Sequence, residues 1–414
     1  MWQYIKYKWK RIFIILAIMG PGLITAFADN DASGVSVYSV AAAQFGYLIL
    51  IITIPMTLLL AVTQEIGARL AIVAEKGLAD LIRERYGVRT AIWMFVFLFI
   101  VNMVVVIMDV SGIKSALTLF GLNPYVFVPI IVGFLALFVV AMNYKTTERF
   151  FLVLIGFYIM YIVSAVLAKP DWGTAFKSLI IPHGTVTPQF LYTAIAVLGT
   201  TVTAWGQFFI NSYVKDKHVT VDNIKYNRWE IYLGAFLTDA FSFFMMVAVI
   251  ATLYVNRVPI TDAAQAAMAI RPFAGDLAGI LFGLGLLVAG MLGCIIVPLS
   301  TAYAFSEFFG YSGSLDEDFR KSKLMYTIFF VQLIIGTLVV MIPQVSLFTI
   351  TVIGNFINGA ILPVIFYFLY QFANNEAIMG EHRNNRLQNW MLVGSGALIS
   401  LGSIAGIVGQ LMGW

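Results

Sequence analysis

The sequence is poor in charge and in the residues that build covalent or metal-clustered scaffolds. Only 11% of its 414 residues are charged, and it contains one cysteine, Cys294. A single cysteine excludes a disulfide framework and a cysteine-rich metal cluster, so we interpret Cys294 as a packing residue. With 61% hydrophobic residues and a mean hydropathy of +0.91, the chain does not have the composition of a water-soluble domain. These values predict a polytopic membrane protein.

Long apolar runs are what the sequence has in quantity. A membrane-spanning helix needs about 20 predominantly apolar residues, and this criterion predicts eleven spans. They cover residues 12–40, 47–71, 92–113, 125–142, 150–167, 190–213, 229–254, 277–305, 325–342, 347–370 and 391–412. The first run is too long for a secretory signal and lacks a small-residue cleavage pattern, so we expect it to be a retained span.

The distribution of lysine and arginine predicts the orientation in the membrane. Cytoplasmic loops carry an excess of both residues. An amino terminus on the cytoplasmic side leaves only Lys114, Lys169, Lys177, Arg257 and Arg271 toward the outside. We therefore expect a plasma-membrane protein with a cytoplasmic amino terminus and an extracellular carboxyl terminus. The net charge of +4 reflects this topology and gives no reason to expect nucleic-acid binding.

Two of the predicted spans are interrupted by polar and small residues. "ITAFADNDASGV", residues 24–35, carries Asp29, Asn30 and Asp31 inside the first apolar run, and "GTTVTAWGQ", residues 199–207, interrupts the sixth. Irregular backbone at membrane depth is tolerated only where it lines a cavity or is buried in protein. Paired broken helices at matching positions are typical of secondary transporters built from two inverted halves.

The spacing of these two breaks predicts the organisation of the chain. Five spans separate them, so we expect an all-α membrane protein with two five-span halves of opposite topology and one extra helix. The halves are residues 1–168 and 169–373, and residues 374–414 form the additional span. We expect a monomer, in contact with the lipid bilayer and with ions.

Further polar groups lie in the third, seventh and tenth spans. "DVSGIK" contains Asp109, "LTDAF" contains Asp239, and "TVIGNFINGAILP" contains Asn355 and Asn358. Carboxylates within a membrane are rare and usually mark an ion or substrate pathway. The alternative is a structural role, in which each side chain is hydrogen-bonded to a neighbouring helix. For Asp109 these two interpretations are equally supported.

The residues around the first break resemble a known family. "GPGLITAFADNDASGVSVYSVAAAQFGY", residues 20–47, is similar to the first span of the NRAMP divalent-metal transporters. "QEIGARLAIVAEKGLADLIRERYG", "GTTVTAWGQFFINS" and "INGAILP" resemble the second, sixth and tenth spans. The resemblance implies a leucine-transporter-like fold, a transported divalent metal ion rather than a cofactor, and no enzymatic activity.

The chain departs from the ordinary pattern of this family at the ion site. Asp31 falls on the family's metal-binding aspartate, but Gly34 stands at its binding asparagine and Thr203 at its sixth-span methionine. This variant pattern resembles the NRAMP-related magnesium transporters. Thioethers favour softer transition metals, whereas oxygen ligands suit Mg²⁺ and Mn²⁺. We therefore expect Mg²⁺, and also Mn²⁺, as substrates, with Mg²⁺ taken partly hydrated because it gives up water reluctantly.

The resemblance and this ligand chemistry together define the expected ion site. Direct contacts are expected from Asp31, the backbone carbonyls near Ala28 and Thr200, the Thr203 hydroxyl and Asn355. Asp29 and Asp239 add carboxylates, and Gly34 leaves room for water. Asp239 stands where the family usually has asparagine, so we hypothesise that its charge attracts the hydrated ion.

The residues linked to proton movement in the family are mostly replaced. None of the three histidines lies in a predicted span, and Trp205 and Ile210 occupy the family's two histidine positions. Gly112 replaces a third-span glutamate, and the ninth span lacks the expected arginine. Only Asp109 remains, so we predict little or no proton coupling.

Three other functions are compatible with parts of the sequence. The first is a proton-coupled Mn²⁺/Fe²⁺ importer of the ordinary NRAMP type that tolerates an unusual site. The second is a sodium-coupled symporter for an organic solute, although two aspartates at the break would repel a carboxylate substrate. The third is an intramembrane protease using Asp109 and Asp239. Neither aspartate has a Gly-any-Gly-Asp context, and a protease does not explain the paired breaks.

Overall fold

The computed structural model describes residues 20–260, 263–311, 313–317, 319–342 and 347–411. Within these ranges the regular structure is entirely helical. The order is α2 (Pro21–Ala28), α3 (Ala32–Phe45), η1 (Gly46–Ile52), α4 (Thr53–Ala74), α5 (Leu78–Leu119), α6 (Pro124–Ala141), α7 (Tyr144–Gly156), α8 (Ile159–Leu167), α9 (Trp172–Lys177), α10 (Pro188–Thr201), α11 (Ala204–Asp216), η2 (Val221–Asn223), α12 (Ile224–Val249), η3 (Ile250–Tyr254), α13 (Ala263–Ala274), α14 (Asp276–Phe309), α15 (Lys323–Met341), α16 (Leu347–Ala373), α17 (Glu376–Met379), η4 (Gly380–His382) and α18 (Arg386–Leu411). The predicted all-α class is confirmed.

Helices, apart from short breaks, occupy all eleven predicted spans wherever the chain is described. By length and composition, eight helical segments of the described chain could cross a membrane, or nine if a bent pair near its carboxyl end counts as one. Residues 32–74 form one such segment, although two spans were expected there. The first and eleventh expected spans reach into residues outside the described ranges. The count of eleven crossings therefore stays a prediction.

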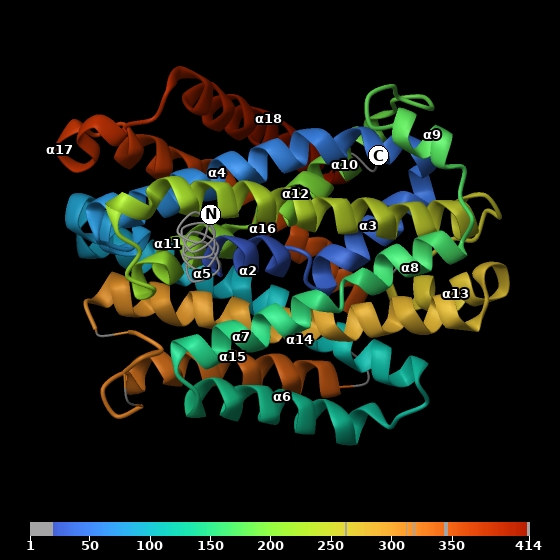
Figure 1. Ribbon diagram of the computed structural model, residues 1–414, viewed down its shortest axis with the longest axis horizontal. Helices are drawn as coiled ribbons and strands as arrows, with labels where there is room; N and C mark the ends of the chain where they lie inside the picture. The colour runs from blue at the N-terminus through green and yellow to red at the C-terminus, as the bar shows by residue number, and fades with distance from the viewer. Residues whose placement is uncertain (1–19, 261–262, 312, 318, 343–346, 412–414) are drawn as a thin grey trace, which may run out of the picture.

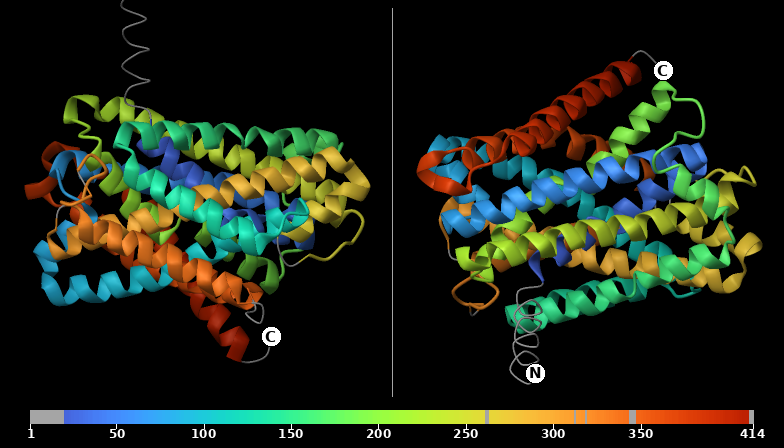
Figure 2. Two further views of the ribbon diagram at one scale, coloured as in Figure 1. Left: turned by 90° about the horizontal axis from the view of Figure 1, so that it is seen from below. Right: turned by 45° about the horizontal axis from the view of Figure 1, so that its top comes forward.

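The broken first span lies at the centre of the bundle. In Figure 1, α2 and α3 (dark blue) run between α12 and α14, and both of these helices contact them. Most helices run along the long axis of the molecule, whereas α18 (red) lies on the outside and is inclined to the others (Figure 2). The central position of α2 and α3 makes the break between them inaccessible to lipid.

The long helix α5 is bent near its amino-terminal end. Gly87 has φ 81° and ψ 171°, a conformation that glycine adopts readily because it has no Cβ. The bend separates residues 78–86, which mix charged residues with buried apolar ones, from the apolar part of the helix that was predicted to cross the membrane. The remainder of α5 packs along α14, where an added Cβ at Gly293 would lie 2.2 Å from Asp109 Oδ2. A small residue at 293 therefore makes room for a carboxylate in the centre of the bundle.

The short helix α2 is held against α12. The Glu230 carboxylate accepts hydrogen bonds from the backbone amides of Gly20 (2.7 Å) and Leu23 (3.0 Å). It thereby satisfies amides at the start of α2 that have no partner within the helix. Gly22 and Gly234 let the two backbones approach, since an added Cβ at Gly234 would lie 3.0 Å from Leu23 Cα.

Candidate metal site

The first helix break is a tight turn that ends with a helix cap. The Asp31 amide donates to the Ala28 carbonyl at 3.0 Å. Asp31 then has extended backbone angles, and its side chain accepts from the Gly34 amide at 2.8 Å as the N-cap of α3. Such a cap satisfies one of the amides left free at a helix start. The turn separates Asp29 and Asp31 so that they do not lie on one continuous helix, as the sequence predicted.

The second break has the same construction. α10 ends at Thr201, and Thr203 is the N-cap of α11, accepting from the Gly206 amide at 3.1 Å. Asn358 of α16 accepts from the Ala204 amide at 3.2 Å. The last carbonyls of α10 have no partner further along the same helix. Thr200, buried one residue before the helix end, is therefore in the part of α10 where a carbonyl is free to bind an ion.

A direct hydrogen bond joins the two breaks. The Thr203 hydroxyl donates to Asp29 Oδ1 at 2.7 Å, and the Gln64 side-chain amide of α4 donates to Asp29 Oδ2 at 2.9 Å. A Cβ at Gly206 would lie 2.8 Å from Thr203 Oγ1 and 3.0 Å from Asp29 Oδ1. Asp29 and Thr203 are thus the two predicted site residues in closest contact, and only glycine at 206 leaves space beside them.

Asp239 has a different environment. It is 1% exposed, and neither of its carboxylate oxygens has a hydrogen-bond partner among the described residues. The Thr57 hydroxyl approaches this carboxylate but donates to the Thr53 carbonyl. Buried carboxylates normally accept hydrogen bonds. Asp239 is therefore held less firmly than Asp29 and Asp31, whose carboxylates accept hydrogen bonds at 2.7 to 2.9 Å.

The three carboxylates lie near one another. Asp29 is within electrostatic range of both Asp31 and Asp239. Tyr38 is within range of all three, and its hydroxyl lies 2.7 Å from the Thr201 hydroxyl. In this conformation, no three histidine, cysteine or acidic side chains in the described parts of the chain come close enough together to hold a metal ion.

Of the remaining predicted ligands, Ala28 and Gly34 make hydrogen bonds through their backbone groups. The Ala28 carbonyl already accepts from the Asp31 amide. The Gly34 amide donates to the Asp31 side chain, which caps α3. A Cβ added at Gly34 would lie 2.8 Å from the Asp29 carbonyl oxygen. Asn355 belongs to α16, but its side chain lies outside what the structure describes.

Asp109 contacts the start of α3 through one carboxylate oxygen, whereas its Oδ2 has no hydrogen-bond partner among the described residues. Its Oδ1 accepts from the Ala32 amide at 3.0 Å, so a carboxylate from α5 caps the first turn of α3. The helix dipole favours negative charge at this end. This contact supports the structural interpretation of Asp109, one of the two that the sequence left open.

Gly112 also belongs to the contact between α5 and α3. A Cβ added at 112 would lie 2.3 Å from the Ala32 Cβ, far inside the normal contact distance. The backbones of the two helices approach here because position 112 has no side chain. A glutamate side chain, which the sequence resemblance leads us to expect at this position in ordinary family members, does not fit the present packing.

Sequence reasoning did not identify Gln64, Tyr38 or Glu230 as functional residues. Gln64 stands out in the sequence only as a polar residue within an apolar run. Two thioethers also lie near the breaks. Met56 Sδ is 3.5 Å from the Thr201 hydroxyl, and Met108 Sδ is 3.7 Å from the Ser33 hydroxyl. The closer acceptor of the Thr201 hydroxyl is the Val197 carbonyl at 2.8 Å.

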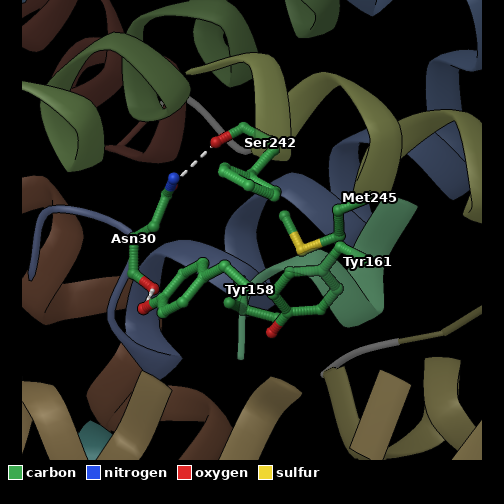
Figure 3. Close-up of a pocket in the computed structure, with 7 residues that line it drawn as sticks. Asn30, Tyr158, Tyr161, Ser242 and Met245 are labelled. Carbon is green, nitrogen blue, oxygen red and sulfur yellow. Dashed lines mark hydrogen bonds between the residues drawn. The ribbon is translucent and has the colours of Figure 1, made fainter. Parts of the chain in front are cut away.

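Asn30 lies beside a narrow gap between α3, α8 and α12. Val35, Tyr158, Tyr161, Phe241, Ser242 and Met245 complete its lining. Figure 3 shows the Asn30 side chain directed to Ser242 and its backbone carbonyl directed to Tyr158. The gap is too narrow for a water molecule. Asn30, Tyr158 and Ser242 therefore satisfy their hydrogen bonds with one another and not with water in this gap.

The family model described as natural resistance-associated macrophage protein-like (Nramp) matches residues 22–409. The chain belongs to the Nramp family. It is 25% identical over 407 residues to the divalent metal cation transporter MntH of Klebsiella pneumoniae, covering 92% of this chain and 94% of that protein. It is 23% identical over 310 residues to MntH of Deinococcus radiodurans, covering 72% of this chain and 70% of that protein. The family is one of membrane transporters rather than enzymes, so the protease interpretation is wrong.

Solved structures agree with this Nramp assignment. A single-residue mutant of the Eremococcus coleocola manganese transporter superposes with a TM-score of 0.79 at 20% identity, covering 96% of this chain and 87% of that one. A Na⁺-coupled sialic acid symporter superposes with a TM-score of 0.60 at 13% identity, covering 95% and 89%. The predicted leucine-transporter-like fold is confirmed.

Proposed function

We propose that this Nramp-family protein transports divalent metal ions by alternating access, with Mg²⁺ as the principal substrate and Mn²⁺ as a second one. The observation that supports this choice is the Thr203 hydroxyl, which lies 2.7 Å from Asp29 at the meeting point of the two helix breaks. An oxygen donor here suits hard ions such as Mg²⁺.

The carboxylates suit a partly hydrated ion. Mg²⁺ keeps several waters and is usually bound through one or two carboxylates. Asp29 and Asp31 flank the break, and Asp239 has two unpartnered oxygens nearby. We propose that Asp239 attracts the hydrated ion and that Asp31, Thr203, Asn355 and the carbonyls of Ala28 and Thr200 contact it directly. Gly34 supports this assignment by leaving no side chain at that position.

We further propose that transport proceeds with little or no proton coupling. Asp109 caps α3, and Gly112 leaves no acid one helical turn away on α5. Histidine, the side chain best suited to titrate near neutral pH, is missing from the predicted spans. The membrane potential alone supplies about 2.3 kcal/mol per charge per 100 mV, or roughly 4.6 kcal/mol for a divalent ion. At about 1.4 kcal/mol per tenfold ratio, this permits roughly thousandfold accumulation.

The topology belongs to the same proposal. We infer inverted halves at residues 1–168 and 169–373 and an additional helix at 374–414, with the amino terminus cytoplasmic and the carboxyl terminus extracellular. The matching construction of the breaks at Asp31 and Thr203 supports the two halves, because each consists of a helix end followed by an N-capped helix start. A monomer contains both breaks and needs no second copy to complete the site.

The alternative is a proton-coupled Mn²⁺/Fe²⁺ importer. It is favoured by the relatives, which are named divalent metal cation and manganese transporters. Competition separates the two functions. Under the alternative, micromolar Mn²⁺ displaces millimolar Mg²⁺, whereas a site of oxygen donors discriminates less.

The decisive experiment is uptake of Mg²⁺, Mn²⁺ and Ca²⁺ into proteoliposomes containing the wild type or Asp31→Ala. We expect saturable Mg²⁺ and Mn²⁺ uptake by the wild type and its loss in Asp31→Ala. Asp222→Asn is the matched control, because Asp222 is an exposed residue of η2. Wild-type uptake of Mn²⁺ without Mg²⁺ would contradict the proposal.

A further inference from the structure

Asn30, the residue between the two acids of the first break, has every side-chain polar group engaged. Its Nδ2 donates to the Thr238 carbonyl at 2.8 Å and to the Thr238 hydroxyl at 2.6 Å. Its Oδ1 accepts from the Ser242 hydroxyl at 2.8 Å. A neutral amide has two donor hydrogens and one acceptor oxygen, and all three are used at this 3% exposed position.

The backbone of Asn30 is held by a different helix. Tyr158, which begins the turn into α8, donates its hydroxyl to the Asn30 carbonyl at 2.8 Å. Tyr158 itself is fully buried. The side chain is thus fixed to α12 and the carbonyl to the α8 end, as the dashed lines of Figure 3 show. Two independent elements hold the middle residue of the Asp29–Asp31 turn.

The hydrogen-bonding groups of α12 that face Asn30 are complementary to a side-chain amide. Thr238 and Ser242 are four residues apart, so they lie on the same face of the helix. Thr238 provides a carbonyl and a hydroxyl that accept from Asn30, and Ser242 provides a hydroxyl that donates to it. An aspartate at 30 would lack the two donors, and an alanine would remove all three contacts. In the alanine variant the Ser242 hydroxyl and the Thr238 carbonyl would keep each other as partners at 3.2 Å.

The acids on either side have no comparable attachment to α12. Asp29 contacts Thr203 and Gln64, on α11 and α4, and Asp31 contacts the Gly34 amide within its own helix. The two carboxylates are therefore bound to different parts of the protein, and the residue between them is fixed to α12.

We propose that Asn30 is a positioning residue that sets the distance between the Asp29 and Asp31 carboxylates and thereby the size of the ion that the site accepts. This inference rests on the proposed function, since it concerns the same ion site. Mg²⁺ demands shorter and more regular coordination than Ca²⁺. A rigid turn therefore favours Mg²⁺, and a turn released from α12 admits Ca²⁺ more readily.

The test loosens Asn30 without touching any group that contacts the ion. Ser242→Ala removes the donor to Oδ1, and Thr238→Val removes the hydroxyl acceptor while keeping the shape. Thr238→Ser retains the hydroxyl and should behave like the wild type. Ser39→Ala and Thr252→Val are the controls, because these buried hydroxyls donate only to carbonyls of their own helical segment.

The readouts are the Kd values for Mg²⁺ and Ca²⁺ by calorimetry on purified protein and the Mg²⁺:Ca²⁺ uptake ratio in proteoliposomes. We expect Ser242→Ala and Thr238→Val to lower the Mg²⁺:Ca²⁺ ratio at least fivefold, with unchanged ratios in Thr238→Ser and both controls. Size-exclusion chromatography checks folding, because a folded variant elutes as a single monodisperse peak. If Thr238→Val does not fold, Ser242→Ala, which deletes only one oxygen atom, carries the test alone.

Two results would overturn the inference. One is a wild-type ratio in folded Ser242→Ala and Thr238→Val. The other is an equal loss of affinity for both ions, which indicates general loosening rather than positioning. These outcomes differ from failure of the proposed function, in which the wild type itself binds neither ion; that result overturns both.

Discussion

The Thr203 hydroxyl donates to Asp29 Oδ1 at 2.7 Å, so the sixth-span break and the first-span break are in direct contact. The same hydroxyl accepts from the Gly206 amide. Thr203 therefore caps α11 and contacts a site carboxylate with one oxygen atom. An ion that binds to both Asp29 and Thr203 must replace this hydrogen bond, which makes residue 203 the position where ligand chemistry is best tested.

Thr203→Met replaces the oxygen by a thioether and should shift selectivity toward Mn²⁺. Thioethers prefer softer ions, so we expect the Mn²⁺:Mg²⁺ preference to rise by about tenfold, equivalent to about 1.4 kcal/mol. Competition of Mn²⁺ against Mg²⁺ uptake measures this preference. Thr203→Ser, which keeps the hydroxyl, is the control and should retain the wild-type preference. A preference that stays unchanged in Thr203→Met would show that residue 203 does not contact the ion.

Asp239→Asn should weaken capture of Mg²⁺ from the outside. The substitution removes a buried charge whose oxygens are unpartnered while keeping the size of the side chain. We expect KM for Mg²⁺ to rise by about tenfold with a smaller change in maximal rate, because the loss is of long-range attraction. Concentration series of Mg²⁺ uptake measure both quantities. Asp222→Asn is the control, and equal KM values in the wild type and Asp239→Asn would remove this role.

The two substitutions Asp109→Asn and Asp109→Leu should have different effects. Asparagine keeps an oxygen that accepts from the Ala32 amide, so uptake should be retained. Leucine removes the cap, and we expect a loss of about 1–2 kcal/mol in the free energy of unfolding, the typical value of an N-cap. Thermal denaturation of the purified variants measures the second effect. Loss of uptake in a folded Asp109→Asn protein would instead favour a role in ion or proton movement.

Mg²⁺ entry should leave the internal pH unchanged. By its resemblance to the family, the chain has Gly112 in place of a third-span glutamate and Trp205 and Ile210 in place of two sixth-span histidines. Asp109 is engaged with the Ala32 amide. A pH-sensitive dye trapped in proteoliposomes, with the membrane potential set by a potassium gradient, measures any accompanying protons. Acidification in proportion to Mg²⁺ entry would contradict uncoupled transport.

Gly206→Ala should reduce uptake strongly. The new methyl group would lie 2.8 Å from Thr203 Oγ1 and 3.0 Å from Asp29 Oδ1, so one of these oxygens must move. Gly133→Ala is the matched control, because a Cβ at this position of α6 meets no atom within 4 Å. Mg²⁺ uptake normalised to protein content measures the effect. Equal rates in both variants would show that the space beside Thr203 is not needed.

The helix breaks were predictable because charged or polar residues within an apolar run are costly in a membrane. The structure places the breaks at residues 29–31 and 202–203, inside the two quoted stretches. The role of Asp109 was not predictable, since its acceptor contact joins residues 77 positions apart. Asn30 was noted only as part of the polar stretch, because its partner Thr238 is 208 positions away. Local patterns thus revealed where the chain is irregular, and contacts between distant segments determine what each polar group does.

The contact between Gly112 and Ala32 also bears on how this protein can evolve. With 2.3 Å between a new Cβ and the existing methyl group, no single substitution at 112 can introduce an acid without first widening the space between α3 and α5. A variant with glutamate at 112 would therefore need compensating substitutions in the packing of α3 against α5 before it could fold in this conformation.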